Sequence, residues 1–554
     1  MAKNVLTAWQ RLIGLLKLDK RDVLQTFYYA IFAGLVNLSL PLGIQAIINL
    51  IQGAQISTSW IILVVLVTGG VAFGGILQLM QIRIIENVQQ KIFTRASFEF
   101  TYRFPKIKMS ELRDYYPPEL ANRFFDTLNV QKGLSKLLLD FPASLLQIIF
   151  GLLLLSFYHP FFIIYGILLL LLIYVVFKFT VQKGMDTSLD ESKQKYKVAH
   201  WIQEVARSLI SFKLSGKTSL AVNKNDMLVT DYLAAREGHF RILVIQFIQM
   251  IGFKVLVTAG LLLIGGLLVL NQEMNIGQFV AAEIIILLVI SSVEKLIRGL
   301  ETFYDLLTSL EKLGQVVDKD LEDQAGETPL TATGDLTVEL DNVTFNVNGK
   351  GNILEDISFK ILPKSTQLIV GTNSSGKSTL LRLIAGIIEP SDGSVYVNNV
   401  SMKGINANHY RSFLGQSLTE ETPFEGTILE NITFGDTSIS QKDLYWALEN
   451  VGLLQFVKQQ PKGLNTILYP EGQQIPYTVA KKIVLARSIV RKPKLLILKD
   501  ALNQFDEIEA LRIMEFLTDK SNPWALVIVS QDPKWIGRCG RIITMENGKI
   551  VSIN

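Results

Sequence analysis

The sequence predicts a six-span α-helical membrane domain followed by an α/β domain that carries a phosphate-binding loop. Two observations support this prediction. Long apolar stretches fill roughly the first three hundred residues, and a short apolar strand further along runs directly into GTNSSGKST. At 554 residues the chain is too long for one ordinary core, so two or more domains are expected.

The first segment, residues 1–20, predicts an amphipathic helix at the membrane surface. Apolar residues recur there at helical spacing among Lys and Arg, namely Leu6, Trp9, Leu12, Ile13 and Leu16. A helix of this kind lies in the interface with its apolar face buried in the lipid. No pattern typical of a secretory signal is evident in this segment.

Six apolar stretches follow, each approaching or exceeding the roughly 20 residues of helix that a bilayer requires. They cover residues 23–51, 60–82, 138–158, 161–182, 243–270 and 276–293. Pro41 is expected to kink the first span, because proline cannot continue the helical hydrogen bonding. Two charges fall inside spans. Lys254 is expected to reach the inner interface rather than a substrate, and Glu283 either faces a cavity or is structural.

The connections between the spans alternate between very short and long. The short ones carry little charge, with Glu273 as their one acid. The long ones, 83–137 and 183–242, are rich in Lys and Arg and poor in turn residues, so we expect them to extend the helices. Since Lys and Arg mark the cytosolic side, the sequence predicts a multi-pass protein of the plasma (inner) membrane with both termini in the cytosol.

Composition excludes several other classes. The single cysteine, Cys539, excludes an intramolecular disulfide framework and a cysteine-based metal cluster. The net charge of +4 is modest, and the basic residues lie between apolar runs. We therefore expect the lipid bilayer, and no nucleic acid, as a partner.

A polar, acidic linker over residues 316–335 separates the two predicted domains, and it contains Gly326, Pro329 and Gly334. The membrane domain is thus expected over 21–315 and the second domain over 336–554. Short strands at 336–340 and 353–361 should open the second domain, which then continues as an α/β succession.

The segment after the apolar strand 367–371 matches the P-loop pattern. Glycines let the backbone wrap around a phosphate, while amide hydrogens and a helix N-terminus supply positive potential. In this pattern Lys377 reaches the terminal phosphates and Ser378 can hold magnesium. The alternative is an inherited loop that is no longer used. The predicted nucleotide-binding residues of the loop are Gly371, Thr372, Asn373, Ser374, Ser375, Gly376, Lys377, Ser378 and Thr379.

With this loop in place, nearly the whole chain resembles a half-transporter of the ATP-binding-cassette (ABC) exporter family, most closely its peptide and type I protein-secretion branch. The resemblance implies a six-span exporter domain plus an α/β P-loop NTPase cassette. It also implies ATP as cofactor and a homodimer, or a heterodimer with another half-transporter, with a periplasmic adaptor protein as a further partner. The family's two coupling helices correspond to residues 115–126 and 204–214.

The resemblance identifies two further positions around the nucleotide. Gln416 corresponds to the glutamine that contacts magnesium and the attacking water, although the following segment 424–432 lies a few residues later than usual. Val347 stands where the family has an aromatic residue that stacks on adenine, which a valine cannot do. Ser378 and Gln416 are the residues expected to hold Mg²⁺, and only if magnesium binds.

The family's signature motif is usually Leu-Ser-Gly-Gly-Gln, and in the resembling proteins it grips the γ-phosphate bound by the partner. The downstream match at 482–487 aligns this chain's segment with it. The proline of this segment removes a backbone donor, and its tyrosine adds bulk where close approach was needed. The degenerate signature consists of Ile475, Pro476, Tyr477, Thr478 and Val479.

The strand 495–498 is followed by Lys499 and Asp500, where the family has Asp-Glu to organise magnesium and polarise water. A cation at this position disfavours the metal by several kcal/mol unless solvent screens it. Alternatively, its ammonium replaces the metal and holds phosphate directly. Asp500 is shorter than glutamate, and a base misplaced by about 1 Å can lose ~100-fold in rate. Gln531 replaces the switch histidine and carries no titratable proton.

In the resembling proteins, each ATP site of the dimer combines the P-loop of one subunit with the signature motif of the other. The replacements in this chain affect both sites, so neither a homodimer nor a heterodimer rebuilds a complete site. The sequence therefore predicts an exporter subunit that binds ATP and hydrolyses it poorly or not at all, within a peptide or protein export system. Two alternatives stay open. One is a non-transporting membrane scaffold or regulator, and the other is an active ATPase in which Lys499 takes over the function of magnesium.

Overall fold

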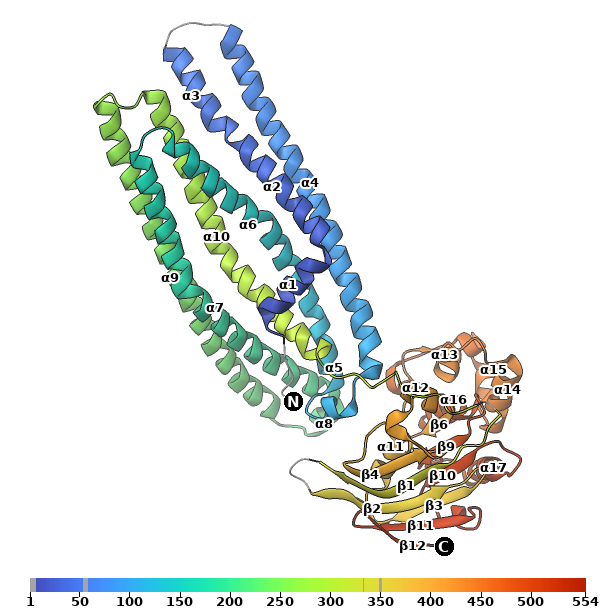
Figure 1. The fold of residues 1–554 in the computed structure, drawn as a ribbon. Helices are drawn as coiled ribbons and strands as arrows, with labels where there is room; N and C mark the ends of the chain where they lie inside the picture. The colour runs from blue at the N-terminus through green and yellow to red at the C-terminus, as the bar shows by residue number, and fades with distance from the viewer. Residues whose placement is uncertain (1–5, 53–57, 332, 348–350) are drawn as a thin grey trace. The chain divides into compact units, whose positions relative to one another are not determined.

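The computed structural model describes residues 6–52, 58–331, 333–347 and 351–554. These form two compact units (Figure 1). Unit 1 comprises Met1–Lys106 and Asp114–Lys319, and unit 2 comprises Ile107–Arg113 and Asp320–Asn554.

Unit 1 consists of helices joined by short connections, with no strand among its described residues. Its elements are α1 (Ala8–Leu18), α2 (Lys20–Asn37), α3 (Ser39–Gln52), α4 (Thr58–Arg103), η1 (Phe104–Lys106), α5 (Pro117–Ala121), η3 (Asn122–Phe125), α6 (Asp126–Ser156), α7 (Phe161–Arg207), α8 (Leu209–Leu214), α9 (Leu220–Leu270) and α10 (Ile276–Val317).

Among the described residues, five helical segments are long and apolar enough to cross a membrane. The remaining predicted span lies in α7, where the described apolar segment covers Phe161–Tyr174. Length and composition thus fit a multi-pass membrane protein. The five segments are Lys20–Gln52, Thr58–Lys106, Pro117–Ser156, Leu220–Leu270 and Ile276–Val317.

The first span is broken near its middle, as Pro41 predicted. Helix α2 ends at Asn37 and α3 begins at Ser39. The ring of a proline clashes with the carbonyl four residues before it, which here belongs to Asn37. The break therefore falls one turn ahead of the proline.

The long connections continue the helices, as predicted: α4 has 46 residues, α7 has 47 and α9 has 51. The expected coupling segments form α5 with η3, and α8, at one end of unit 1 (Figure 1). Lys254 of α9 forms an ion pair with Glu294 of α10, a partner that no sequence pattern indicated. Glu283 is partly buried in α10.

Helix α1 is tied to the end of α10. Thr7 and Gln10 form a capping box at its start, and Leu12 is buried while Trp9 is exposed. Arg11 donates a hydrogen bond to Asp318 at 2.8 Å. The amphipathic pattern therefore buries one side of α1 against unit 1 and leaves the other side open.

Unit 2 contains two larger sheets within its described residues, of order β2-β1-β4-β5 and β12-β11-β3-β10-β9-β6. The second has a parallel centre, since β10 pairs parallel with both β3 and β9. The strands are β1 (Val338–Asn346), β2 (Asn352–Ile361), β3 (Thr366–Gly371), β4 (Asp392–Val397), β5 (Val400–Ser401), β6 (Leu414–Ser417), β7 (Gly426–Thr427), β8 (Ile467–Leu468), β9 (Leu495–Lys499), β10 (Ala525–Val529), β11 (Arg541–Glu546) and β12 (Lys549–Ile553).

Helices connect these strands and cover the sheets, and two buried apolar clusters form the core of the unit. The helices are η2 (Met109–Leu112), α11 (Lys377–Ile384), η4 (Met402–Gly404), α12 (Ala407–Ser412), α13 (Ile428–Thr433), α14 (Gln441–Asn450), α15 (Leu454–Gln459), η5 (Gly463–Asn465), η6 (Pro470–Gly472), α16 (Tyr477–Ile489), α17 (Glu507–Thr518) and η7 (Pro533–Trp535).

Candidate functional site

The site lies at the carboxyl ends of three adjacent parallel strands, β3, β10 and β9. Ligands of open α/β sheets bind at this edge. A cleft of about 840 Å³ opens there. It is lined by Ile353, Asn373, Ser374, Ser375, Gly376, Lys377, Ser378, Thr379, Lys499, Asp500, Asn503, Val529, Ser530, Gln531 and Asp532.

The sheet order explains why residues far apart in the sequence meet in this cleft. Strand β3 ends in the glycine-rich loop, β9 ends at Lys499, and β10 leads to Gln531. The predicted residues from Asn373 to Thr379, with Lys499, Asp500 and Gln531, all line it. Gly371 and Thr372 lie at the strand end beside the cleft and contribute carbonyl groups to the loop.

Other predicted positions do not line the cleft. Gln416 lies on β6, opposite Ile497 of β9. Val347 follows β1 and packs partly buried against the apolar core. The segment 475–479 lies at the start of α16.

The glycine-rich loop is held in a closed, preorganised form. Lys377 Nζ donates to the carbonyls of Gly371 at 2.9 Å and Thr372 at 2.5 Å, and to Ser375 Oγ at 3.1 Å. Gly376 has φ +93°, and a Cβ there would lie 2.6 Å from Leu354 Cδ2. Only glycine fits such a position without strain. The first three residues of α11, Lys377 to Thr379, line the cleft beside this loop.

The charges that act on Asp500, on the opposite wall of the cleft, are those of three lysines. Burial lowers the pKa of Lys377, and the charge of Lys499 acts in the same direction against the attraction of Asp500. Burial raises the pKa of the Asp500 carboxyl, while Lys499, Lys377 and Lys481 oppose that shift. Asp500 also has φ +47°, and its N–H donates to the carbonyl of Val529 at 3.0 Å. Three ammonium groups thus surround one carboxylate.

Gln531 closes the cleft from β10. Its Nε2 donates to Asn373 Oδ1 at 3.4 Å, a long hydrogen bond across the cleft to the glycine-rich loop. An amide of this kind can donate to a phosphate oxygen but cannot accept and return a proton.

The segment aligned with the signature motif does open a helix. Pro476 is the N-cap residue of α16, with ψ 142° and no side-chain hydrogen bond to the helix, and Tyr477 begins the helix 47% exposed. One turn on, Lys481 Nζ donates to the carbonyl of Thr419 at 3.2 Å, and burial lowers its pKa. The helix start therefore has a proline in place of the motif's serine, and Tyr477 and Thr478 in place of its two glycines.

Sequence reasoning missed five lining residues, Ile353, Asn503, Val529, Ser530 and Asp532. All of them except Ile353 lie at or just beyond the ends of β9 and β10, so the strand ends already indicated their region. Asp532 Oδ1 accepts from the N–H of Lys534 at 3.0 Å and caps η7. Ile353 lies on β2, whose place beside the loop depends on a sheet pairing that no local motif indicates.

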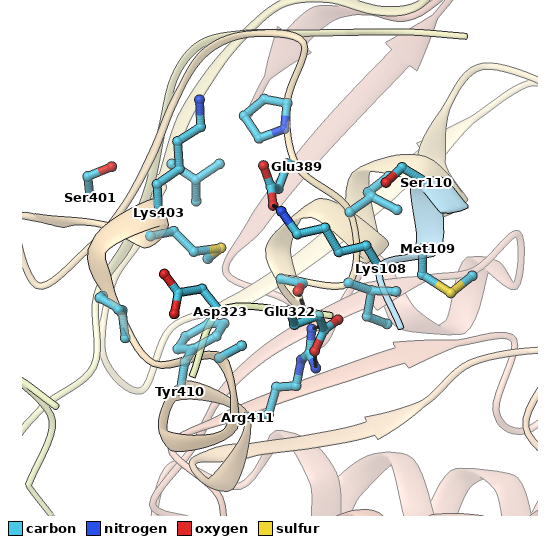
Figure 2. Close-up of a pocket in the computed structure, with 18 of the residues that line it drawn as sticks. Lys108, Met109, Ser110, Glu322, Asp323, Glu389, Ser401, Lys403, Tyr410 and Arg411 are labelled. Atoms are coloured by element: carbon cyan, nitrogen blue, oxygen red, sulfur yellow. Dashed lines mark hydrogen bonds and ion pairs between the residues drawn. The ribbon is translucent and has the colours of Figure 1, made fainter. Parts of the chain in front are cut away.

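A second cavity of unit 2, about 390 Å³ in volume, lies where the segment 107–113 packs against the unit (Figure 2). Ile107 forms a β-bridge with Leu321. Lys108 pairs with Glu389 at 3.5 Å, and Arg411 pairs with Glu322 at 2.6 Å. The bridge of Ile107 and the ion pair of Lys108 thus connect the segment 107–113 to the rest of unit 2.

Comparisons with known proteins match both units. The family model described as "ABC transporter transmembrane region" matches residues 24–293, and the one described as "ABC transporter" matches residues 354–503. A Rickettsia bellii protein described as an export ATP-binding/permease protein is 24% identical over 477 residues, which cover 84% of this chain and 81% of that protein.

Other relatives match over shorter regions. The alpha-hemolysin translocation ATP-binding protein HlyB of Escherichia coli O157:H7 is 29% identical over 55% of this chain and 43% of its own length. The ATP-dependent lipid A-core flippase of Burkholderia orbicola is 27% identical over 55% of this chain and 51% of its own length.

A solved structure, that of a bacterial Atm1-family ABC exporter with ATP bound, has a TM-score of 0.85 at 15% sequence identity. The match covers 97% of this chain and 95% of the other. At this identity the likeness establishes the fold.

Proposed function

This chain belongs to the ABC transporter family with the architecture of an exporter half-transporter, and from that premise we propose that it binds ATP but hydrolyses it poorly or not at all. The observation that carries the proposal is the contrast within one cleft. The glycine-rich loop is complete, whereas the strand ends facing it present Lys499 and Gln531.

Phosphate binding is supported by the loop itself. Lys377 is positioned by three hydrogen bonds to the loop, and the missing side chain of Gly376, at φ +93°, lets the loop pack closely against Ile353 and Leu354 of β2. A helix N-terminus behind such a loop favours an anion. The residues present therefore fit the phosphate chain of a nucleotide.

Slow hydrolysis is supported by the catalytic groups that the cleft lacks. Asp500 is the carboxylate nearest the position of the family's base, but it is one methylene shorter than glutamate, and while burial raises its pKa, the charges of three lysines act to lower it. Proton abstraction requires a base within hydrogen-bond reach of water and a pKa matched to its task. Gln531 supplies no titratable group, and Pro476 opens α16 without a capping side chain. These residues therefore do not supply the groups that efficient hydrolysis requires.

We further propose that the chain works as a homodimer or a heterodimer with another half-transporter in the plasma membrane, with both termini cytosolic, in a peptide or protein export system with a periplasmic adaptor. The likeness to HlyB, named for translocation of alpha-hemolysin, supports the substrate class. The basic residues of the long helical connections support the orientation.

The test is ATP binding and ATPase activity of the purified full-length protein. ATP should bind, with turnover close to the background. Joint replacement Lys499→Asp, Gln531→His and restoration of Leu-Ser-Gly-Gly-Gln at 475–479 should raise the rate at least ~10-fold, the gain typical of restored acid–base positioning. Turnover by the unmodified protein at the rate of a complete cassette would contradict the proposal.

Transport is a separate test, which distinguishes an exporter subunit from a membrane scaffold. Vesicles containing the chain alone, or with a second half-transporter, would be loaded with labelled peptide. ATP-dependent movement supports the exporter role. ATP binding without movement in either vesicle supports a non-transporting regulator.

A further inference from the structure

The cleft contains an ammonium group that the structure leaves available to a ligand. Lys499 is the last residue of β9 and lines the cleft together with Lys377 and Ser378. Within the described ranges, Lys499 Nζ makes no hydrogen bond or ion pair with the protein. Lys377 Nζ, in contrast, is held by three loop oxygens. A partly buried cation without a protein partner is matched by an anionic ligand.

The same cleft offers a poor donor set for magnesium, the metal that the family implies. Magnesium in nucleotide sites is bound through one or two carboxylates together with phosphate oxygens, in near-octahedral geometry. The carboxylates among the cleft's lining residues are Asp500 and Asp532. Asp532 already accepts the N–H of Lys534 as a helix cap.

Asp500 is no better suited to the metal. The ammonium charges of Lys377, Lys481 and Lys499 all act on its carboxylate, so a divalent cation placed beside it would meet three like charges. No group of three or more His, Cys, Asp or Glu able to hold a metal occurs among the residues that the structure describes. Of the two residues expected to hold the metal, Ser378 lines the cleft with a neutral hydroxyl oxygen, and Gln416 is not among the lining residues. The residues present do not fit magnesium.

We propose that the cleft binds a nucleoside triphosphate free of divalent metal, with the Lys499 ammonium contacting the phosphate oxygens that a metal would otherwise bridge. Lysine suits this role, because its compact ammonium has three donors and binds phosphate as a point charge. Lys377 and Lys499 then hold the phosphate chain from two walls of the cleft. This inference rests on the proposed function, since it specifies the form in which ATP is bound.

The experiment is calorimetric titration of the purified full-length protein with ATP, once in Mg²⁺ and once in EDTA. The unmodified protein should bind ATP in EDTA with an affinity within about threefold of that in Mg²⁺, or tighter. Lys499→Asp replaces the ammonium by a carboxylate and should reverse this preference, weakening binding in EDTA at least ~10-fold, with recovery in Mg²⁺. Lys520→Asp, the same charge change at an exposed lysine outside the cleft, should behave as the unmodified protein.

The outcomes separate the two ideas. Binding that requires Mg²⁺ in the unmodified protein would overturn the metal-free inference and leave ATP binding intact. Absence of binding in both buffers would overturn the proposed function as well. A second variant, Lys499→Met, removes the ammonium without adding a negative charge to the cleft. It should weaken ATP binding in EDTA several-fold, and an unchanged affinity in a folded Lys499→Met protein would also overturn the inference.

Discussion

The two walls of the phosphate cleft differ in how far they keep the features of an ATP-hydrolysing cassette. The wall formed by the β3–α11 loop has the glycine at positive φ, the lysine fixed by loop carbonyls and the helix N-terminus that phosphate binding requires. The wall formed by the ends of β9 and β10 has the same strand positions but a different chemistry, with Lys499 and Gln531.

This difference shows that the fold and the chemistry depend on separate sets of residues. The strands under both walls are buried and apolar, and they fix the position of every strand end. Lys499 and Gln531, at the ends of these strands, belong to neither apolar cluster, so they can change without loss of the fold. Substitutions on each wall should therefore separate binding from turnover.

The largest effect on ATP binding is expected from a substitution in the wall formed by the β3–α11 loop. Lys377→Met removes the ammonium but keeps an unbranched side chain. It should weaken ATP binding by about 10- to 100-fold, since a hydrogen bond to a charged group contributes about 1.5–3 kcal/mol. Calorimetry on the purified protein measures the change. Lys364→Met, an exposed lysine in the turn before β3, is the control. Equal affinities for the two variants would contradict the role given to the loop.

Gly376→Ala should act through both conformation and space. Its φ is +93°, and the added Cβ would lie 2.9 Å from the carbonyl oxygen of Ile353. We expect a loss of about 1–3 kcal/mol in unfolding free energy and roughly tenfold weaker ATP binding. The matched control is Gly435→Ala, at φ +73° with no atom within 4 Å of the added Cβ. If both variants lose the same stability and neither loses affinity, the close approach at Gly376 has no role in binding.

The sequence predicted much of this contrast because the relevant signals are local. The glycine-rich loop follows its strand directly, and Lys499 and Gln531 each follow an apolar strand of recognisable composition. The break of the first span at Asn37 followed from Pro41 in the same way. Long spans were equally predictable, since their length and hydropathy need no tertiary context.

What the sequence did not predict depends on pairings between distant segments. Ile353 reaches the cleft through β2, and Lys481 approaches Asp500 from α16. Lys254 meets Glu294 because α9 and α10 pack together. The segment 107–113 groups with unit 2 through the bridge from Ile107 to Leu321, although it lies in the sequence between helices of unit 1. No local pattern contains these contacts.

A smaller effect is expected at the position of the base-stacking residue. Val347→Tyr supplies a ring at the position where the resemblance expects base stacking, and it should raise ATP affinity about 3- to 10-fold, because aromatic stacking contributes about 0.5–1.5 kcal/mol. Inorganic tripolyphosphate, which has no base, should bind the variant and the unmodified protein equally. A rise in tripolyphosphate affinity would show that the substitution acts on the phosphate wall instead of on the base.

The smallest effect is expected at Asp500, the carboxylate on the wall formed by the ends of β9 and β10. Burial raises the pKa of Asp500 in the folded state above its ordinary value near 3.8, so the folded protein binds this proton more tightly than the unfolded chain does. Ionised Asp500 therefore lowers stability at neutral pH, and this penalty disappears as the pH falls below the ordinary value. Asn tolerates the positive φ of this position, so Asp500→Asn removes the charge without changing the backbone.

Asp500→Asn should accordingly melt at a higher temperature than the unmodified protein at pH 7, and the difference should shrink as the pH is lowered toward 4. Thermal unfolding followed at several pH values measures it. If Asp500→Asn instead melts at a lower temperature than the unmodified protein at pH 7, the carboxylate is stabilised by Lys377, Lys481 and Lys499 more than burial destabilises it. The charges of Asp500 and the three lysines would then stabilise one another, and Lys499 would be less available to a phosphate ligand.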